Sequence, residues 1–205
     1  MRYLRENKGT LLLAFLVAPA FYIDRTVMVW ISGHCAFHSA EWYRPIDYLV
    51  KIGTHGTTII VLSAVVFLGA KPYSRRLSDI GRTLFAGVIT AGIAVQGVKH
   101  LFGRARPRVT FDTLFIGPSI RGSYDSFPSG HTTLLFCLAF ILSRYFPRYR
   151  ILFYLYAVIG AADRLLGLSH FPSDVLAGAV LGTVISKLAL SGKIAGITPP
   201  CPVSE

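Results

Sequence analysis

The sequence Ser126-Phe127-Pro128-Ser129-Gly130-His131 stands where a polar stretch gives way to a long apolar run. Proline suits a first helical turn, serine can cap a helix, and glycine lets an anion approach the backbone. The stretch therefore predicts an apolar helix, beginning at His131, that offers its positive end to a phosphate. His131 is expected beside that anion.

A second polar interruption lies downstream, at 164–174, with the sequence RLLGLSHFPSD. It supplies the guanidinium of Arg164, the imidazole of His170 and, four residues later, the carboxylate of Asp174. If this stretch is helical, the carboxylate can reach the imidazole and orient it.

Upstream, Lys99 and Arg106-Pro107 complete a third pattern, KxxxxxxRP, which precedes PSGH and RxxxxxHxxxD within 99–174. The order and spacing of these motifs resemble the type 2 phosphatidic acid phosphatase superfamily, and the apolar segments resemble its membrane branch. The family usually has Ser before the third-motif Arg, whereas this chain has Asp163. We expect Asp163 to face away from the phosphate or to pair with a neighbouring cation, because an unpaired carboxylate would oppose a dianion.

The resemblance implies a catalytic group of His170, His131 and Asp174. His170 would attack phosphorus, Asp174 would hold its tautomer, and His131 would protonate the leaving alkoxide. These roles suit the chemistry of the side chains, because a neutral imidazole is nucleophilic and a second imidazole can be the acid at physiological pH.

Cations from three separated segments on one membrane face are what a phosphate dianion needs, because guanidinium groups bind phosphate bidentately. The residues expected to bind the phosphate are Lys99, Arg106, Ser129, Gly130 and Arg164. No metal and no other cofactor is expected, because these cations take the role that magnesium has elsewhere. Other polar residues of the region are interpreted as headgroup contacts (Arg104, Arg108 and Arg121) or as structural (His55 and His100).

The composition indicates a single membrane-embedded domain over 1–205. Of the 205 residues, 53% are hydrophobic and 15% charged, which is too apolar for an ordinary soluble domain. The formal charge of +11 fits anionic lipid or an anionic substrate, with basic residues bracketing apolar runs, and nucleic acid is not expected as a partner. The three cysteines lack metal-ligand spacing and predict neither a disulfide framework nor a zinc site.

Six apolar segments predict an all-α integral-membrane bundle of six transmembrane helices. They lie at 11–31, 52–70, 83–98, 131–145, from 151–162 onward, and at 172–190. Asp24 and Arg25 are expected to form an ion pair at the outer end of the first segment; the alternative is a cleaved signal peptide.

Between the first two segments, residues 33–51 are polar and aromatic and are expected at the membrane interface, with His34 and His38 as interface residues rather than a metal pair. Gly87, Gly92 and Gly97 are expected to permit close helix approach.

The distribution of Lys and Arg predicts the topology. Twelve lie on the side of the two chain ends and nine on the other, and three of those nine belong to the motifs. The positive-inside rule then places the ends in the cytoplasm and the motifs at the outer face of a bacterial inner membrane.

The predicted function is an integral-membrane phosphatase acting on a lipid monophosphate or diphosphate. Phosphatidylglycerol phosphate, phosphatidic acid, an isoprenyl diphosphate and the phosphates of lipid A all fit, with a bacterial envelope lipid favoured. The alternatives are a vanadate-dependent haloperoxidase, whose anion pocket is similar, and a non-catalytic protein that binds lipid headgroups. The sequence does not indicate an oligomeric state.

Overall fold

Long α-helices make up most of the part of the chain that the computed structural model describes, which is residues 2–34, 41, 45, 48, 56–70, 72–192 and 194. The main helices are α1 (Arg2–His34), α3 (Gly56–Ala70), α4 (Arg75–Phe102), α5 (Gly130–Tyr145), α6 (Arg150–Leu166) and α7 (Pro172–Leu190). A short 3-10 helix, η3 (Pro147–Tyr149), joins α5 to α6. No strand occurs within these described ranges, which confirms the all-α bundle.

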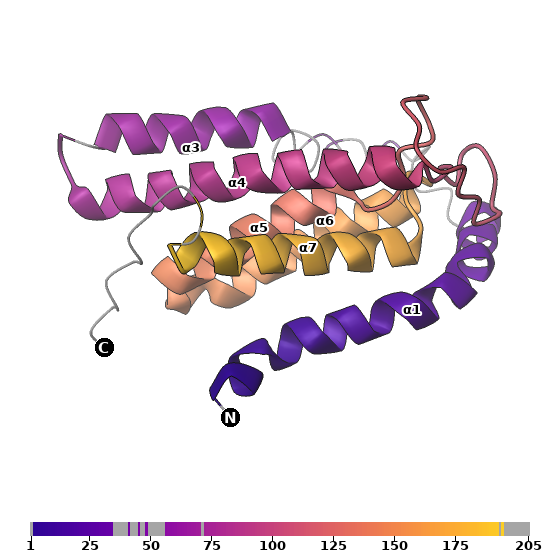
Figure 1. Cartoon of the computed structure of the whole chain (residues 1–205), viewed down its shortest axis with the longest axis horizontal. Coiled ribbons are helices and arrows are strands. Elements are labelled where there is room, and N and C mark those ends of the chain that lie inside the picture. Colours follow the sequence, from indigo (N-terminus) through magenta and orange to yellow (C-terminus); the bar gives the residue numbers. More distant parts are fainter. Residues whose placement is uncertain are drawn as a thin grey trace.

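The helices run along one long axis (Figure 1). α3 lies beside α4, and α5, α6 and α7 form the rest of the bundle, with α1 crossing its lower side. α1 is bent and contains Pro19, and a proline inside a helix is a common cause of such a bend. The loop 103–129, the end of α6 and the start of α7 lie at the same end of the bundle, which brings the three motifs together.

Within the described part of the chain, three helices are long and apolar enough to cross a membrane, namely Lys8–His34 within α1, Arg75–Phe102 and Pro172–Leu190. The last has the bounds that the sequence predicts. α3, α5 and α6 are shorter, with 15, 16 and 17 residues. The predicted interface segment and its His38 lie mostly outside the described residues, but His34 belongs to α1 and its ring stacks on Trp30.

Glycines let α7 approach α5 closely. A Cβ on Gly178 would lie 2.6 Å from the Ser129 carbonyl oxygen, and one on Gly182 would lie 2.2 Å from the carbonyl oxygen of Thr133. The predicted role of Gly87 is confirmed, because a Cβ there would meet Ile141 at 2.8 Å. The prediction was wrong for the other two glycines of that segment, 92 and 97, which face open space.

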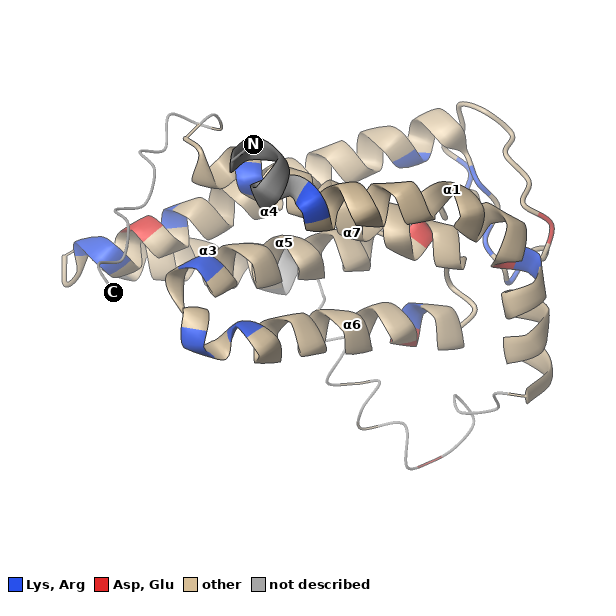
Figure 2. Ribbon diagram, turned by 90° about the horizontal axis from the view of Figure 1, so that it is seen from below, with Lys and Arg blue, Asp and Glu red and all other residues tan. Residues whose placement is uncertain are grey.

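Apolar side chains fill the bundle and also cover its outside. The main core cluster includes Leu84, Val88 and Ile141, from α4 and α5. Large apolar side chains such as Phe15 and Ile151 are exposed on the outer surface, as a bilayer-facing surface requires. Figure 2 shows that Lys and Arg gather toward the two ends of the bundle.

Candidate active site

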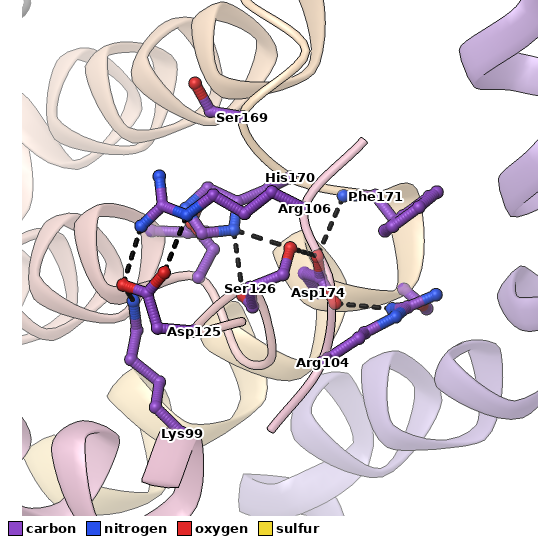
Figure 3. Close-up of polar contacts among 12 residues, drawn as sticks. Lys99, Arg104, Arg106, Asp125, Ser126, Ser169, His170, Phe171 and Asp174 are labelled. Atoms are coloured by element: carbon purple, nitrogen blue, oxygen red, sulfur yellow. Dashed lines mark hydrogen bonds and ion pairs between the residues drawn. The ribbon is translucent and has the colours of Figure 1, made fainter. Parts of the chain in front are cut away.

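His170 lies in the turn 167–171 between α6 and α7, and its side chain is buried. Its Nδ1 is 2.8 Å from the backbone carbonyl oxygen of Ser126 (Figure 3). Because a carbonyl only accepts hydrogen bonds, this contact requires the proton on Nδ1, which leaves Nε2 with a lone pair. Burial lowers the pKa of His170, although the Asp174 carboxylate opposes that shift, so the imidazole is neutral at physiological pH.

Asp174 is in the first turn of α7, where its carboxylate is fully buried. Its Oδ2 accepts hydrogen bonds from Ser126 Oγ at 2.6 Å and from the Phe171 N–H at 2.8 Å, and lies 3.7 Å from His170 Nδ1. Asp174 thus lies within ion-pair distance of the His170 ring, and its predicted role in holding the imidazole stays a prediction. Asp174 also fixes Ser126, whose carbonyl orients the ring.

Arg104 is the centre of a buried ion cluster. Its guanidinium donates to Asp174 Oδ1 at 2.5 Å, to Ser173 Oγ at 2.6 Å and to Asp24 Oδ2 at 2.5 Å. Its Cζ lies 4.2 Å from the centre of the Phe171 ring. The prediction that Arg104 contacts headgroups is wrong, because two carboxylates in the protein interior need a cation.

The predicted ion pair between Asp24 and its neighbour Arg25 is wrong, because Asp24 pairs with Arg104. Arg25 is exposed and lies 3.5 Å from Asp112 in the loop 103–129. Asp24 Oδ1 also accepts the backbone N–H of Ser173 at 2.9 Å. The first helix thus contributes directly to the start of α7.

The cations of the first motif meet at the carboxylate of Asp125. Arg106 donates to it through Nε at 2.8 Å and a terminal nitrogen at 2.7 Å, and Lys99 Nζ lies 3.5 Å away (Figure 3). Burial favours protonation of Asp125, but the hydrogen bonds from Arg106 and the charge of Lys99 hold the pKa of the carboxyl well below its usual value. Asp125 is therefore ionised.

The start of α5 joins the first and third motifs. The Ser129 N–H donates to the Asp174 backbone carbonyl at 3.0 Å, and a Cβ on Gly130 would lie 3.9 Å from Lys99 Nζ. The prediction that Pro128 lies in the first turn of the helix is wrong, because α5 begins at Gly130 and Ser129 is its cap residue. The side chain of Ser129 makes no capping hydrogen bond. His131 is partly buried and within electrostatic reach of the three motif cations and of His170.

Arg164 lies in the last turn of α6, beside the turn 167–171, and its backbone carbonyl accepts the N–H of Ser169 and of His170. Its side chain forms an ion pair with Asp163, which confirms that Asp163 pairs with a neighbouring cation. Among the described residues, Arg164 Nε is buried without a hydrogen-bond partner. It is a donor that an incoming oxyanion can use.

Arg108 braces the turn that carries His170. It donates to the Gly167 carbonyl at 2.8 Å and to Ser169 Oγ at 2.7 Å. The residue is exposed, and its predicted headgroup contact stays a prediction. His100 is structural as predicted, with Nδ1 2.9 Å from the Ser119 carbonyl oxygen. Arg121 is exposed, and His55 lies outside the described residues.

Residues 81–193 match the sequence model of the PAP2 superfamily, which covers more than half of the chain. The chain belongs to the PAP2 superfamily. The motifs at 99–174 lie wholly within the matched residues. Arg104, Asp24, Ser126 and Asp125 were not among the predicted site residues. For the three charged residues the signal is charge in or beside apolar sequence, but only the fold pairs Asp24 with Arg104 across 80 positions.

Relatives of this PAP2 chain include proteins named lipid A 1-phosphatase. One from Rhizobium etli is 34% identical over 125 residues, which are 58% of this chain and 53% of the relative. One from Porphyromonas gingivalis is 30% identical over 113 residues, or 53% of this chain and 21% of the relative. The chain therefore aligns with about half the length of the Rhizobium relative and less of the other.

Two solved structures have a similar fold. The crystal structure of Aquifex aeolicus LpxE covers 82% of this chain and 95% of its own, with a TM-score of 0.63 and 20% identity. That of the transmembrane PAP2-type phosphatidylglycerolphosphate phosphatase from Bacillus subtilis covers 90% and 95%, with a TM-score of 0.67 and 21% identity. Both likenesses are evidence of a shared membrane fold.

Proposed function

We propose that this chain is an integral-membrane lipid phosphatase that works through a phosphohistidine. The observation that carries the proposal is the bond between His170 Nδ1 and the Ser126 carbonyl, which leaves Nε2 as a neutral nucleophile. Cations from three segments surround the same turn and suit a phosphate dianion. A protein that only binds lipid headgroups has no need to hold His170 in the tautomer that leaves Nε2 unprotonated.

In the first step, His170 Nε2 attacks phosphorus, and the bond from phosphorus to the lipid oxygen breaks. His131 gives its proton to that oxygen, so the lipid leaves as an alcohol, or as a lipid monophosphate when the substrate is a diphosphate. Lys99, Arg106 and Arg164 stabilise the charge on the equatorial oxygens of the transition state. Gly130, at the positive end of α5, allows close approach of the phosphate.

In the second step, water attacks the phosphohistidine while His131 accepts a proton from it. The bond from phosphorus to nitrogen breaks, and inorganic phosphate and the neutral imidazole are released. Ser126 and Asp174 act in both steps as positioning residues, because they hold the ring and do not contact phosphorus.

For the substrate, we favour a phosphate of lipid A, which the names of the sequence relatives support. The site then faces the periplasmic side of a bacterial inner membrane, as the distribution of basic residues favours. Phosphatidylglycerol phosphate, phosphatidic acid and isoprenyl diphosphate are the comparison substrates.

The test is phosphate release by the purified full chain in detergent from each of these lipids. We expect the fastest release from lipid A, complete loss in His170→Ala, and unchanged rates in chelator. Release from none of them, or full activity in His170→Ala, contradicts the proposal. Bromination with added vanadate would instead indicate haloperoxidase chemistry.

A further inference from the structure

Asp125 occupies the cations that the proposed mechanism assigns to the substrate. Both oxygens of its carboxylate are bound by the guanidinium fork of Arg106, and one also faces Lys99 Nζ. A planar carboxylate in a guanidinium fork uses the same two donors that a phosphate uses. Figure 3 shows the three side chains turned toward one another beside His170.

This ion pair differs from the buried one around Arg104 in its access to solvent. The side chains of Arg104, Asp24 and Asp174 are 0% exposed, and their ion pairs link α1, the loop 103–129 and α7. The side chain of Asp125 is 32% exposed and that of Arg106 27%. A half-buried carboxylate can rotate into water at little cost, whereas a fully buried one cannot.

The charges of the site favour an exchange between Asp125 and a phosphate. A phosphate dianion carries twice the charge of a carboxylate and has an additional oxygen to offer. Arg164 Nε, which is buried and without a partner in the described part of the chain, supplies a donor for that oxygen. A phosphate that binds Lys99, Arg106 and Arg164 should therefore displace Asp125, which contacts only Lys99 and Arg106.

We propose that Asp125 is an internal competitor for phosphate, which neutralises Lys99 and Arg106 in the free enzyme, swings out when the substrate phosphate binds, and returns as inorganic phosphate leaves. This inference rests on the proposed function for the identity of the phosphate site. Its consequence is weaker binding of every phosphate ligand, product included. If the carboxylate occupies the cations about 90% of the time, the apparent affinity for phosphate falls by about tenfold.

The test is equilibrium binding of orthophosphate to the purified full chain in detergent, measured by titration calorimetry without turnover. Asp125→Asn keeps the shape of the side chain and removes its charge, so orthophosphate should bind about tenfold more tightly. Asp125→Ser should do the same, and Asp125→Glu should retain the weak binding of the wild type. The matched control is Asp112→Asn, which removes an exposed carboxylate of the same loop and should leave the affinity unchanged.

A purely structural role would give the opposite result. If Asp125 only orients Arg106, the neutral variants should bind orthophosphate more weakly, and that result, or an unchanged affinity, overturns the inference. Failure of the proposed function is seen separately, as a wild-type chain that releases no phosphate from any lipid. Tighter orthophosphate binding in both neutral variants would support the internal competitor whatever the lipid substrate is.

Discussion

At the residue scale, the proposed chemistry depends on the backbone carbonyl of Ser126. It accepts a hydrogen bond from His170 Nδ1–H, while the hydroxyl group of Ser126 donates a hydrogen bond to the Asp174 carboxylate. The carboxylate therefore acts on the imidazole through the intervening residue and through its charge at 3.7 Å. Loss of this carboxylate should weaken the positioning of His170 without removing the nucleophile.

The two histidines should differ in their dependence on the leaving group. His170→Ala should abolish turnover on every substrate, because the nucleophile is lost. His131→Ala should slow lipid hydrolysis by about 10²–10⁴-fold but retain more activity on an aryl phosphate, whose phenolate leaves without a proton. Rates of both variants on a lipid and an aryl phosphate make the comparison. A phosphohistidine trapped at His131 would reverse the assigned roles.

The buried position of His170 predicts an unusual acid limit of activity. Burial lowers the pKa of the imidazole below 6.5, so the neutral, nucleophilic form persists as the pH falls through that value. The apparent kcat/KM, corrected for the second ionisation of the substrate phosphate, should decline only below pH 6.5. A decline centred at or above this pH would mean that the imidazole is not desolvated in the free enzyme.

At the element scale, α1 is joined to α7 by buried charge rather than by apolar contact alone. Asp24 on α1 accepts from Arg104 and from both the backbone N–H and the hydroxyl group of Ser173. The same Arg104 holds Asp174 at the start of α7. The position of the first helix is therefore coupled to the start of α7, next to His170.

Asp24→Asn should destabilise the fold strongly. Removal of one partner from a buried ion pair costs about 3–5 kcal/mol, because the remaining charge stays buried without compensation. Asp112→Asn breaks an exposed pair and should cost no more than about 1 kcal/mol. Thermal unfolding of the two variants in the same detergent is the measurement. Equal shifts in Tm would show that the buried cluster contributes little.

The helices and motifs could be predicted from sequence because long apolar runs and local spacing carry that information. The bounds of α7 and the pairing of Asp163 with its neighbour followed from such local signals. The roles of Arg104 and Asp24 could not be predicted, because a cation beside an apolar run reads equally well as a headgroup contact. Only the folded chain brings these two residues together, and the turn after α6 likewise separates His170 from the expected helix.

At the scale of the whole molecule, the grouping of basic residues toward the two ends predicts how the chain lies in the membrane. A carboxyl-terminal alkaline phosphatase fusion should be inactive, because that end is expected in the cytoplasm, where the reporter does not fold. A fluorescent-protein fusion at the same point should be bright. An active phosphatase fusion would mean that the site faces the cytoplasm.

The shortness of α5 and α6 has a consequence for the surrounding bilayer. Their 16 and 17 residues span only about 24–26 Å, against a hydrocarbon thickness of about 30 Å. Such hydrophobic mismatch is relieved by local thinning of the lipid, which lowers the headgroups toward the end of the bundle where α5 begins and α6 ends. Lipid phosphates would thereby be drawn toward His170 by bilayer elasticity, so that acyl-chain length in the host membrane would tune how readily a substrate enters.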